Sequence, residues 1–227
     1  TSPLAQRLAA AVIVAGIVLG CRVISMADAS LDAWWALFLL ASLATFAQLY
    51  YPANDTPGPR IIHPCLFAGL LCLPPFLFVL LVLIPHICSW LVVRRQRGHH
   101  PIDDMLLAFR AATQIIAGAA ALGILGGWSA RASAEIITLA EPAVLLAVAL
   151  YVSIDLGLDA LVFLPIKQTP QRKLELWVKG WLGSYALTCL GYLLGLFWQI
   201  DRGLVLLALL PMALIYRSSR LPELQQE

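Results

Sequence analysis

Apolar runs of about 20 residues follow one another along the sequence, with only short polar breaks between them. A helix needs about 20 residues to cross the hydrocarbon core of a bilayer. Residues 8–26 contain one charged side chain, that of Arg22, and residues 34–51 contain none. This pattern predicts an all-α protein, a polytopic transmembrane helical bundle.

The composition agrees with a chain that lies in lipid. Charged residues make up 12% of the chain, and hydrophobic residues make up 61%. Soluble domains carry roughly 25% charged residues. The chain therefore has too little charge to cover a surface that faces water, which excludes an ordinary soluble enzyme and a disordered protein. The formal net charge of +2 gives no indication of a nucleic-acid partner, so the lipid bilayer is the expected partner.

The length of 227 residues allows about six or seven spans and leaves no room for a separate catalytic domain. We expect a single membrane domain over residues 1–216. A basic and polar tail, or the start of a linker, follows at 217–227. Four further spans are expected at 105–127, 136–164, 174–198 and 203–216. The first of these four is rich in alanine and glycine, which permits close helix contacts, so we place it at the centre of the bundle.

The third apolar segment, from Ile61 to Val93, is interrupted by Pro74 and Pro75 and again by Pro85. A continuous helix of this length would measure about 50 Å, well beyond a hydrocarbon core of about 30 Å. We predict a short half-helix or re-entrant piece over 64–73, followed by a span over 76–93. The alternative is one long, kinked and tilted helix. Non-helical backbone at this depth has to be buried within protein.

Three basic stretches, 94–97, 167–173 and 217–220, alternate with poorly charged connections at 128–135 and 199–202. The positive-inside rule places the basic stretches on the cytoplasmic side, so the C-terminus is expected in the cytoplasm. The predicted location is the cytoplasmic (inner) membrane of a bacterium, with several passes through it.

Ionisable groups inside a span are costly and are therefore candidates for function. Asp155 and Asp159 are four residues apart, so they share one face of a helix. Two carboxylates in that position are suited to binding a cation, relaying a proton or pairing with a base. The alternative is a structural ion pair, or a place close to the membrane interface.

Other polar side chains in the apolar runs complete the candidate ligand-binding set. His86 lies beside Pro85 and is suited either to ligating a metal or pigment magnesium or to hydrogen bonding between helices. Gln114 is expected to form hydrogen bonds between helices. We predict a cavity lined by His63, Cys65, His86, Gln114 and Asp155, with Asp159 as a further candidate.

Metal and catalytic signatures do not appear in this sequence. The four histidines form no H-x-x-x-H or H-E-x-x-H pattern, and the five cysteines form no C-x-x-C pair, so we predict no metal site. No nucleophile elbow, P-loop or dinucleotide-binding motif is present, so we do not expect an enzyme. The sequence does not identify a cofactor. A pigment or a lipid is expected if the chain is a subunit of a complex.

Three segments together resemble a known family. They are His63–Phe67 (HPCLF) with Leu73–Pro75 (LPP), Ile84–Leu91 (IPHICSWL) before the basic loop, and Leu209–Gln225 (LLPMALIYRSSRLPELQ). They resemble the N-terminal membrane domain that precedes GGDEF or HD-GYP domains in bacterial cyclic-di-GMP signalling proteins. The sequence contains neither of the two catalytic signatures, so the resemblance implies a sensory or anchoring role. It implies either the membrane part of a longer protein or a stand-alone relative.

Three functions follow from these features. The first is a non-catalytic sensory or anchoring domain that binds a hydrophobic or small ligand or a partner, with a shift of the last helix, 203–216, passed on through 217–225. The second is an accessory subunit of a larger respiratory or photosynthetic membrane complex. The third is a small transporter or a vitamin-uptake component. The expected protein partners are other membrane subunits or a second copy of the chain.

Overall fold

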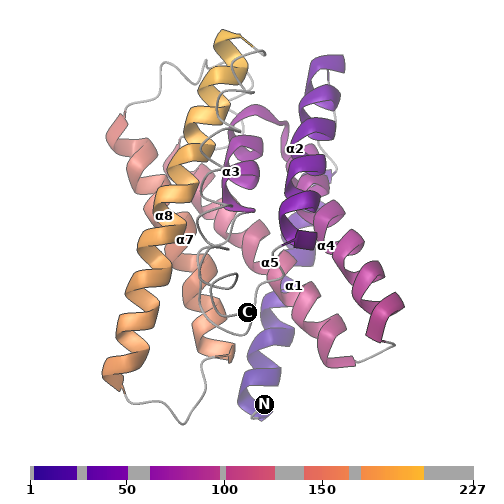
Figure 1. Ribbon diagram of the computed structural model, residues 1–227, viewed down its shortest axis with the longest axis vertical. Coiled ribbons are helices and arrows are strands. Elements are labelled where there is room, and N and C mark those ends of the chain that lie inside the picture. The colour runs from indigo at the N-terminus through magenta and orange to yellow at the C-terminus, as the bar shows by residue number, and fades with distance from the viewer. Residues whose placement is uncertain are drawn as a thin grey trace, which may run out of the picture.

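The structure is a computed structural model that describes residues 3–24, 30–50, 62–97, 101–125, 141–163 and 170–201. Every regular element in these ranges is a helix, which confirms the all-α prediction. The helices form one bundle in Figure 1. Their bounds are α1 (Pro3–Ile24), α2 (Leu31–Tyr50), α3 (His63–Cys72), α4 (Pro75–Arg97), α5 (Pro101–Ile124), α7 (Glu141–Phe163) and α8 (Pro170–Ile200).

Six of these helices are long and apolar enough to cross a bilayer, and α3 is too short to do so. The chain is therefore a multi-pass membrane protein. The six long helices correspond to six predicted spans, with ends that differ by a few residues. The seventh predicted span, 203–216, and the tail at 217–227 lie outside the described residues.

Prolines divide the third apolar segment as predicted. α3 ends at Cys72, and Leu73 is extended, with φ of −101° and ψ of 146°. A residue that precedes proline is disfavoured in the helical region, so Leu73 and Pro74 break the helix before α4 begins at Pro75. α4 continues through Pro85. The half-helix is therefore confirmed, and the alternative of one continuous helix is wrong at Pro74.

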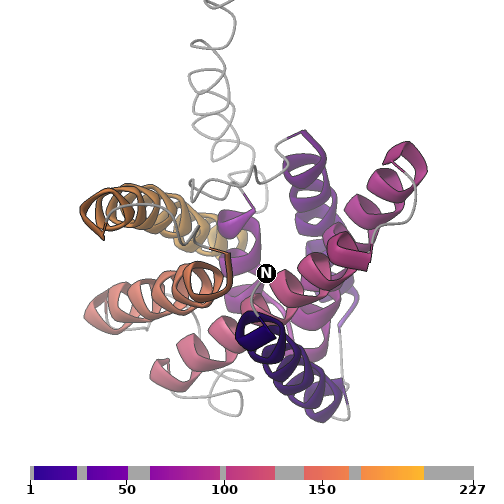
Figure 2. The ribbon, with the colours of Figure 1, turned by 90° about the horizontal axis from the view of Figure 1, so that it is seen from below.

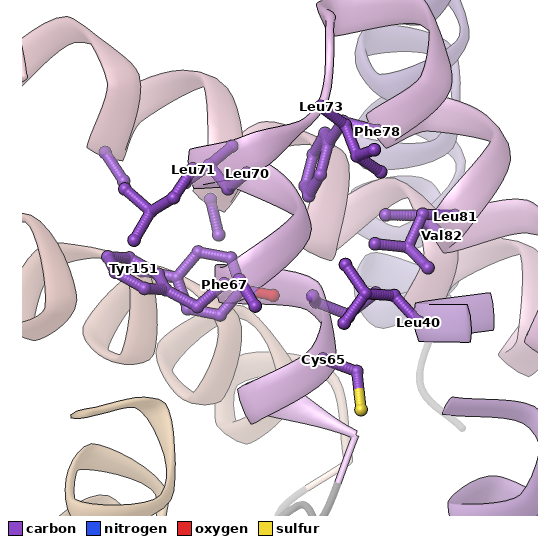
Figure 3. Close-up of a cluster of buried hydrophobic side chains, with 14 of the residues drawn as sticks. Leu40, Cys65, Phe67, Leu70, Leu71, Leu73, Phe78, Leu81, Val82 and Tyr151 are labelled. Carbon is purple, nitrogen blue, oxygen red and sulfur yellow. The ribbon is translucent and has the colours of Figure 1, made fainter. Parts of the chain in front are cut away.

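α3 lies inside the bundle, and its residues from His63 to Leu71 are all buried. It packs against α8, α2 and α4, and Figure 2 shows the longer helices arranged around it. Figure 3 shows Phe67 of α3 beside Tyr151 of α7, whereas Leu40 of α2 lies on the other side of α3 with side chains of α4. This burial meets the requirement that a break in a membrane helix be enclosed by protein.

Glycines set the closest contacts between helices. A Cβ added at Gly191 of α8 would lie 2.5 Å from the carbonyl oxygen of Pro64 and 2.9 Å from its Cα. Gly195, one turn later, meets Leu71 in the same way, with 3.3 Å between the added Cβ and the leucine Cβ. α8 therefore meets the backbone of α3 at Gly191 and a side chain of α3 at Gly195, along a Gly-x-x-x-Gly stripe whose spacing is typical of helix contacts in membranes.

α5 occupies the central place predicted for it. In its membrane-spanning part 56% of the residues are buried, against 17–39% in the other spans. The outward faces of the other membrane-spanning helices carry large exposed apolar side chains, which on α1 include Val14, Ile17 and Val18. Such faces suit contact with lipid tails. The end of α4 and the start of α8 lie at the same, lower, end of the bundle in Figure 1.

Candidate functional site

His63 is the first residue of α3, as the proline that follows it indicates. Proline fits the first turn of a helix because its missing N–H would have no partner there. Ile62 caps the helix without a side-chain hydrogen bond. The His63 side chain has no exposed surface, although it stands at a helix end, a place where water usually supplies hydrogen-bond partners.

The imidazole of His63 faces a carboxylate on a different helix. Its Nε2 lies 3.0 Å from Oδ2 of Asp155 on α7. The other carboxylate oxygen, Oδ1, lies 3.0 Å from the hydroxyl of Thr113 on α5. All three side chains have an exposure of 0%. We call these three residues the buried polar centre, and they join α3, α5 and α7.

An aromatic ring packs directly against the histidine, and a second aromatic ring packs against the first. The Tyr151 ring lies edge to face with the His63 ring, with 5.6 Å between centroids and 84° between planes. Tyr151 makes a similar contact with Phe67, at 5.8 Å and 74°. Tyr151 is one turn before Asp155 on α7, so it covers the histidine from the helix that supplies the carboxylate. Electrostatic contacts in such an apolar enclosure are stronger than in water.

The face of α8 that packs against the start of α3 consists of small residues, two of which are polar. Ser184 and Thr188 are fully buried, and the Thr188 hydroxyl donates a hydrogen bond of 2.6 Å to the carbonyl oxygen of Ser184. Their spacing from Gly191 is that of neighbouring turns, so the three residues share one face of the helix. Because Gly191 lies against Pro64, this is the face that meets α3.

The arrangement is suited to holding charge or a proton away from water. A single carboxylate in the membrane interior is costly, and hydrogen bonds from His63 and Thr113 reduce that cost. Within the described part of the chain, Nδ1 of His63 has no hydrogen-bond partner. The contact of 3.0 Å between Oδ2 of Asp155 and Nε2 of His63 pairs the carboxylate with a base, one of the alternatives that the sequence left open.

Asp159 lies one turn further along α7 and is only partly buried, whereas Asp155 is fully buried. The two carboxylates that share a helix face thus have different surroundings. The prediction that they act together in one site stays untested, and the contacts of the buried polar centre involve Asp155 alone.

Cys65 and Gln114 are both buried, as a lining role would require. Figure 3 shows the Cys65 sulfur pointing away from Tyr151, on the side of α3 where Leu40 lies. Gln114 follows Thr113 on α5, and its Oε1 has no hydrogen-bond partner among the described residues. The structure therefore separates Cys65 from the buried polar centre. Gln114 is adjacent in sequence to Thr113, which belongs to that centre.

His86 is buried on α4, and its Nδ1 lies 2.8 Å from the carbonyl oxygen of Val82, one turn earlier on the same helix. A carbonyl only accepts, so Nδ1 is the donor. This hydrogen bond of Nδ1 stays within α4, and the interhelical hydrogen bond that the sequence suggested for His86 stays a prediction. No group of three or more His, Cys, Asp or Glu side chains that could hold a metal ion occurs in the described ranges.

Thr113 and Tyr151 are the two parts of this site that the sequence did not single out. Thr113 precedes the candidate Gln114 in an otherwise apolar run, and Tyr151 precedes Asp155 by one turn. Helical spacing from an intramembrane carboxylate is the signal that points to Tyr151. The only local signal for Thr113 is its place beside Gln114 in an apolar run.

The fold and the buried polar centre define a class: a polytopic helical membrane protein built around an enclosed half-helix. Comparison takes the chain no further than this class, since no protein-family model, curated protein or solved structure matches it significantly.

Proposed function

We propose that the chain is a non-catalytic membrane sensory or anchoring module. The buried polar centre receives a small ligand or the effect of a partner, and α8 passes the response toward residues 202–227. The contact between α3 and α8 carries this proposal. Pro64, the residue after His63, fills the space that a side chain at Gly191 would need. A displacement of His63 is therefore transmitted to α8 with no gap to absorb it.

The resemblance to membrane domains that precede GGDEF or HD-GYP domains supports the same role. In that arrangement the last membrane helix leads into the output domain. Here the predicted last helix, 203–216, directly follows α8 in the sequence. The signal would leave through the segment at 217–225.

We place the protein in the cytoplasmic membrane of a bacterium, with its basic loops and C-terminus in the cytoplasm. The exposed Arg94 and Arg95 at the end of α4 support this orientation. The stretch 167–173 leads into α8, whose start lies at the same end of the bundle. The proposed protein partner is a second copy of the chain, with other membrane subunits as the alternative.

The proposal is tested by measuring whether the buried polar centre controls the position of α8. Spin labels carried by non-canonical amino acids would replace Leu182 on α8 and Phe38 on α2, which are 56% and 66% exposed. The distance between the labels would be measured by pulsed electron resonance in lipid nanodiscs. We expect His63→Gln to move α8 by about 2 Å, the size of helix shifts in known switches.

His86→Gln is the matched control, because it changes a buried histidine whose Nδ1 hydrogen bond stays within α4. It should leave the distance between the labels unchanged. An unchanged distance in a folded His63→Gln protein would remove the sensory proposal. Native mass spectrometry of the same protein tests the accessory-subunit alternative, which requires other polypeptides in a fixed ratio.

A small transporter is the second candidate, and one observation favours it. Discontinuous helices next to buried ionisable residues form the substrate sites of many transporters. Here α3 and α4 form such a broken pair, and His63 brings the break to Asp155. Substrate or proton flux into proteoliposomes that is lost in Asp155→Asn would support transport and displace the sensory proposal.

A further inference from the structure

The hydroxyl of Thr113 has one hydrogen and two acceptors within reach. Its Oγ1 lies 2.8 Å from the carbonyl oxygen of Arg110 and 3.0 Å from Oδ1 of Asp155. A carbonyl oxygen cannot donate, so the shorter contact is a hydrogen bond only when Thr113 gives its hydrogen to Arg110. The contact with Asp155 then lacks a hydrogen unless the carboxyl group supplies it.

Two protonation states follow from this count. With Asp155 ionised, Thr113 and Nε2 of His63 both donate to the carboxylate, and the Arg110 carbonyl receives nothing from Thr113. With a proton on Oδ1, Asp155 donates to Thr113 and Thr113 donates to Arg110, while Oδ2 still accepts from His63. In the ionised state the single hydrogen of Thr113 would have to be shared between two acceptors, and each of the three observed contacts has a hydrogen of its own only in the second state. The geometry thus has a place for one more proton than an ionised Asp155 and a neutral His63 carry.

We propose that the ligand of the buried polar centre is a proton, held jointly by Asp155 and His63, so that the protein responds to proton activity on one side of the membrane. This inference rests on the sensory function proposed above and names its signal. The proton belongs to the pair, because it can reside on the carboxyl group or on the imidazole. Its uptake makes the site neutral overall, which suits the membrane interior.

Complete enclosure favours a proton over a larger ligand. His63, Thr113 and Asp155 have no exposed surface, and Tyr151 covers the histidine ring. An organic ligand would have to displace α3 before it touched these side chains. A proton needs no cavity and can arrive through transient hydrogen-bonded water.

Other ionisable groups near Asp155 and His63 contribute to the electrostatic potential at this pair. By helical register the charged side chains nearest to the pair on α5 and α7 are those of Arg110, one turn before Thr113, and Asp159, one turn after Asp155. α8, which packs against α3 and α7, carries the exposed Lys179. Charged side chains of α1, α2 and α4 with described placement lie near the helix ends, at Arg7, Arg22, Asp32, Arg94 and Arg95. The neutral ionisable neighbours on the packed helices are Cys65, His86, Tyr151, Tyr185 and Cys189.

Infrared difference spectroscopy on the full chain in nanodiscs tests the proposal directly. A protonated carboxylic acid has a C=O stretch that a carboxylate lacks. Spectra would be compared between about pH 5 and about pH 9, a range that brackets the charge change of an unperturbed histidine. We expect a carboxylic acid band in the wild type that gains intensity as the pH falls, is absent in Asp155→Asn, and persists in Asp159→Asn.

A milder pair of variants keeps the test independent of folding. Thr113→Val keeps the shape of the side chain but removes the hydroxyl, so the band should move to higher frequency as its hydrogen bond is lost. Thr113→Ser keeps the hydroxyl and should leave the frequency unchanged. A band that does not titrate, or one that is identical in Asp155→Asn, would overturn the proton assignment.

The spin-label distance separates this inference from the function on which it rests. If α8 moves in His63→Gln but no carboxylic acid band titrates, the sensory function stands and the ligand is not a proton. If the band titrates but α8 keeps its position at every pH, the proton site stands and the sensory function fails. Support for both requires the band and the distance to change over the same pH range.

Discussion

His63 and His86 are both buried histidines beside a proline, yet they differ in what they hold together. Nε2 of His63 meets a carboxylate 92 residues away, on another helix. Nδ1 of His86 meets the carbonyl oxygen of Val82, four residues earlier on its own helix. One contact joins separate parts of the chain, and the other adds to a helix that its own backbone already forms. Burial and residue type alone therefore do not distinguish a site from a packed core residue.

The largest difference is expected when each histidine is replaced by alanine. Both changes leave a similar cavity. His63→Ala also leaves the buried carboxylate of Asp155 without its base, a loss of about 3–5 kcal/mol in other buried pairs. His86→Ala removes a hydrogen bond within one helix, worth about 1 kcal/mol. Equilibrium unfolding in mixed micelles measures both, and equal losses would end the distinction between the two histidines.

A change at Gly191 tests whether the backbone next to His63 packs against α8 as closely as the distances indicate. Gly191→Ala places a methyl group against the backbone of Pro64, which we expect to destabilise the fold by about 1–3 kcal/mol. Gly157→Ala on α7 is the control, because a Cβ there meets nothing within 4 Å. Its effect should be neutral or stabilising by about 0.5–1 kcal/mol, since alanine favours a helix over glycine. Similar melting curves for both variants would show that the backbone at the start of α3 can move to make room for the methyl group at little cost in stability.

The smallest effect sharpens the role of Thr113 in the network around His63. Thr113→Val removes one hydrogen bond to Asp155, and such bonds between membrane helices average about 0.6 kcal/mol. Thr113→Ser should retain that stability because it keeps the hydroxyl. The same unfolding assay checks both variants, and a loss in Thr113→Ser as large as in Thr113→Val would assign the effect to the methyl group instead.

Most of the fold follows from local features of the sequence. The length of each apolar run determines a span because the bilayer fixes the required helix length. The break between α3 and α4 follows from Pro74 and Pro75, whose effect on the preceding residue is local. Helix ends differ from prediction by several residues. α1 begins at Pro3, ahead of the apolar run that starts at residue 8, because a helix can extend beyond the apolar run that marks the membrane.

The site was predictable only as separate residues. His63 and Asp155 both stood out as polar groups in apolar runs, but nothing local to either one indicates the other. Their contact depends on how α3 packs against α8 and reaches the side chains of α7, which long-range packing decides. The Gly-x-x-x-Gly spacing at Gly191 and Gly195 is the one sequence signal for that packing.

The enclosure of α3 also bears on how the protein enters the membrane. Its ten residues measure about 15 Å, half of a hydrocarbon core, and from His63 to Leu71 they have no face for lipid. The helices that cover it at Asp155 and Gly191 are synthesised roughly 90 and 130 residues later. α3 therefore has to wait, at the membrane surface or beside the insertion machinery, until the C-terminal half of the bundle arrives. Its docking is a late step of assembly, and a chain that ends before α7 would expose a half-helix that lipid cannot accommodate.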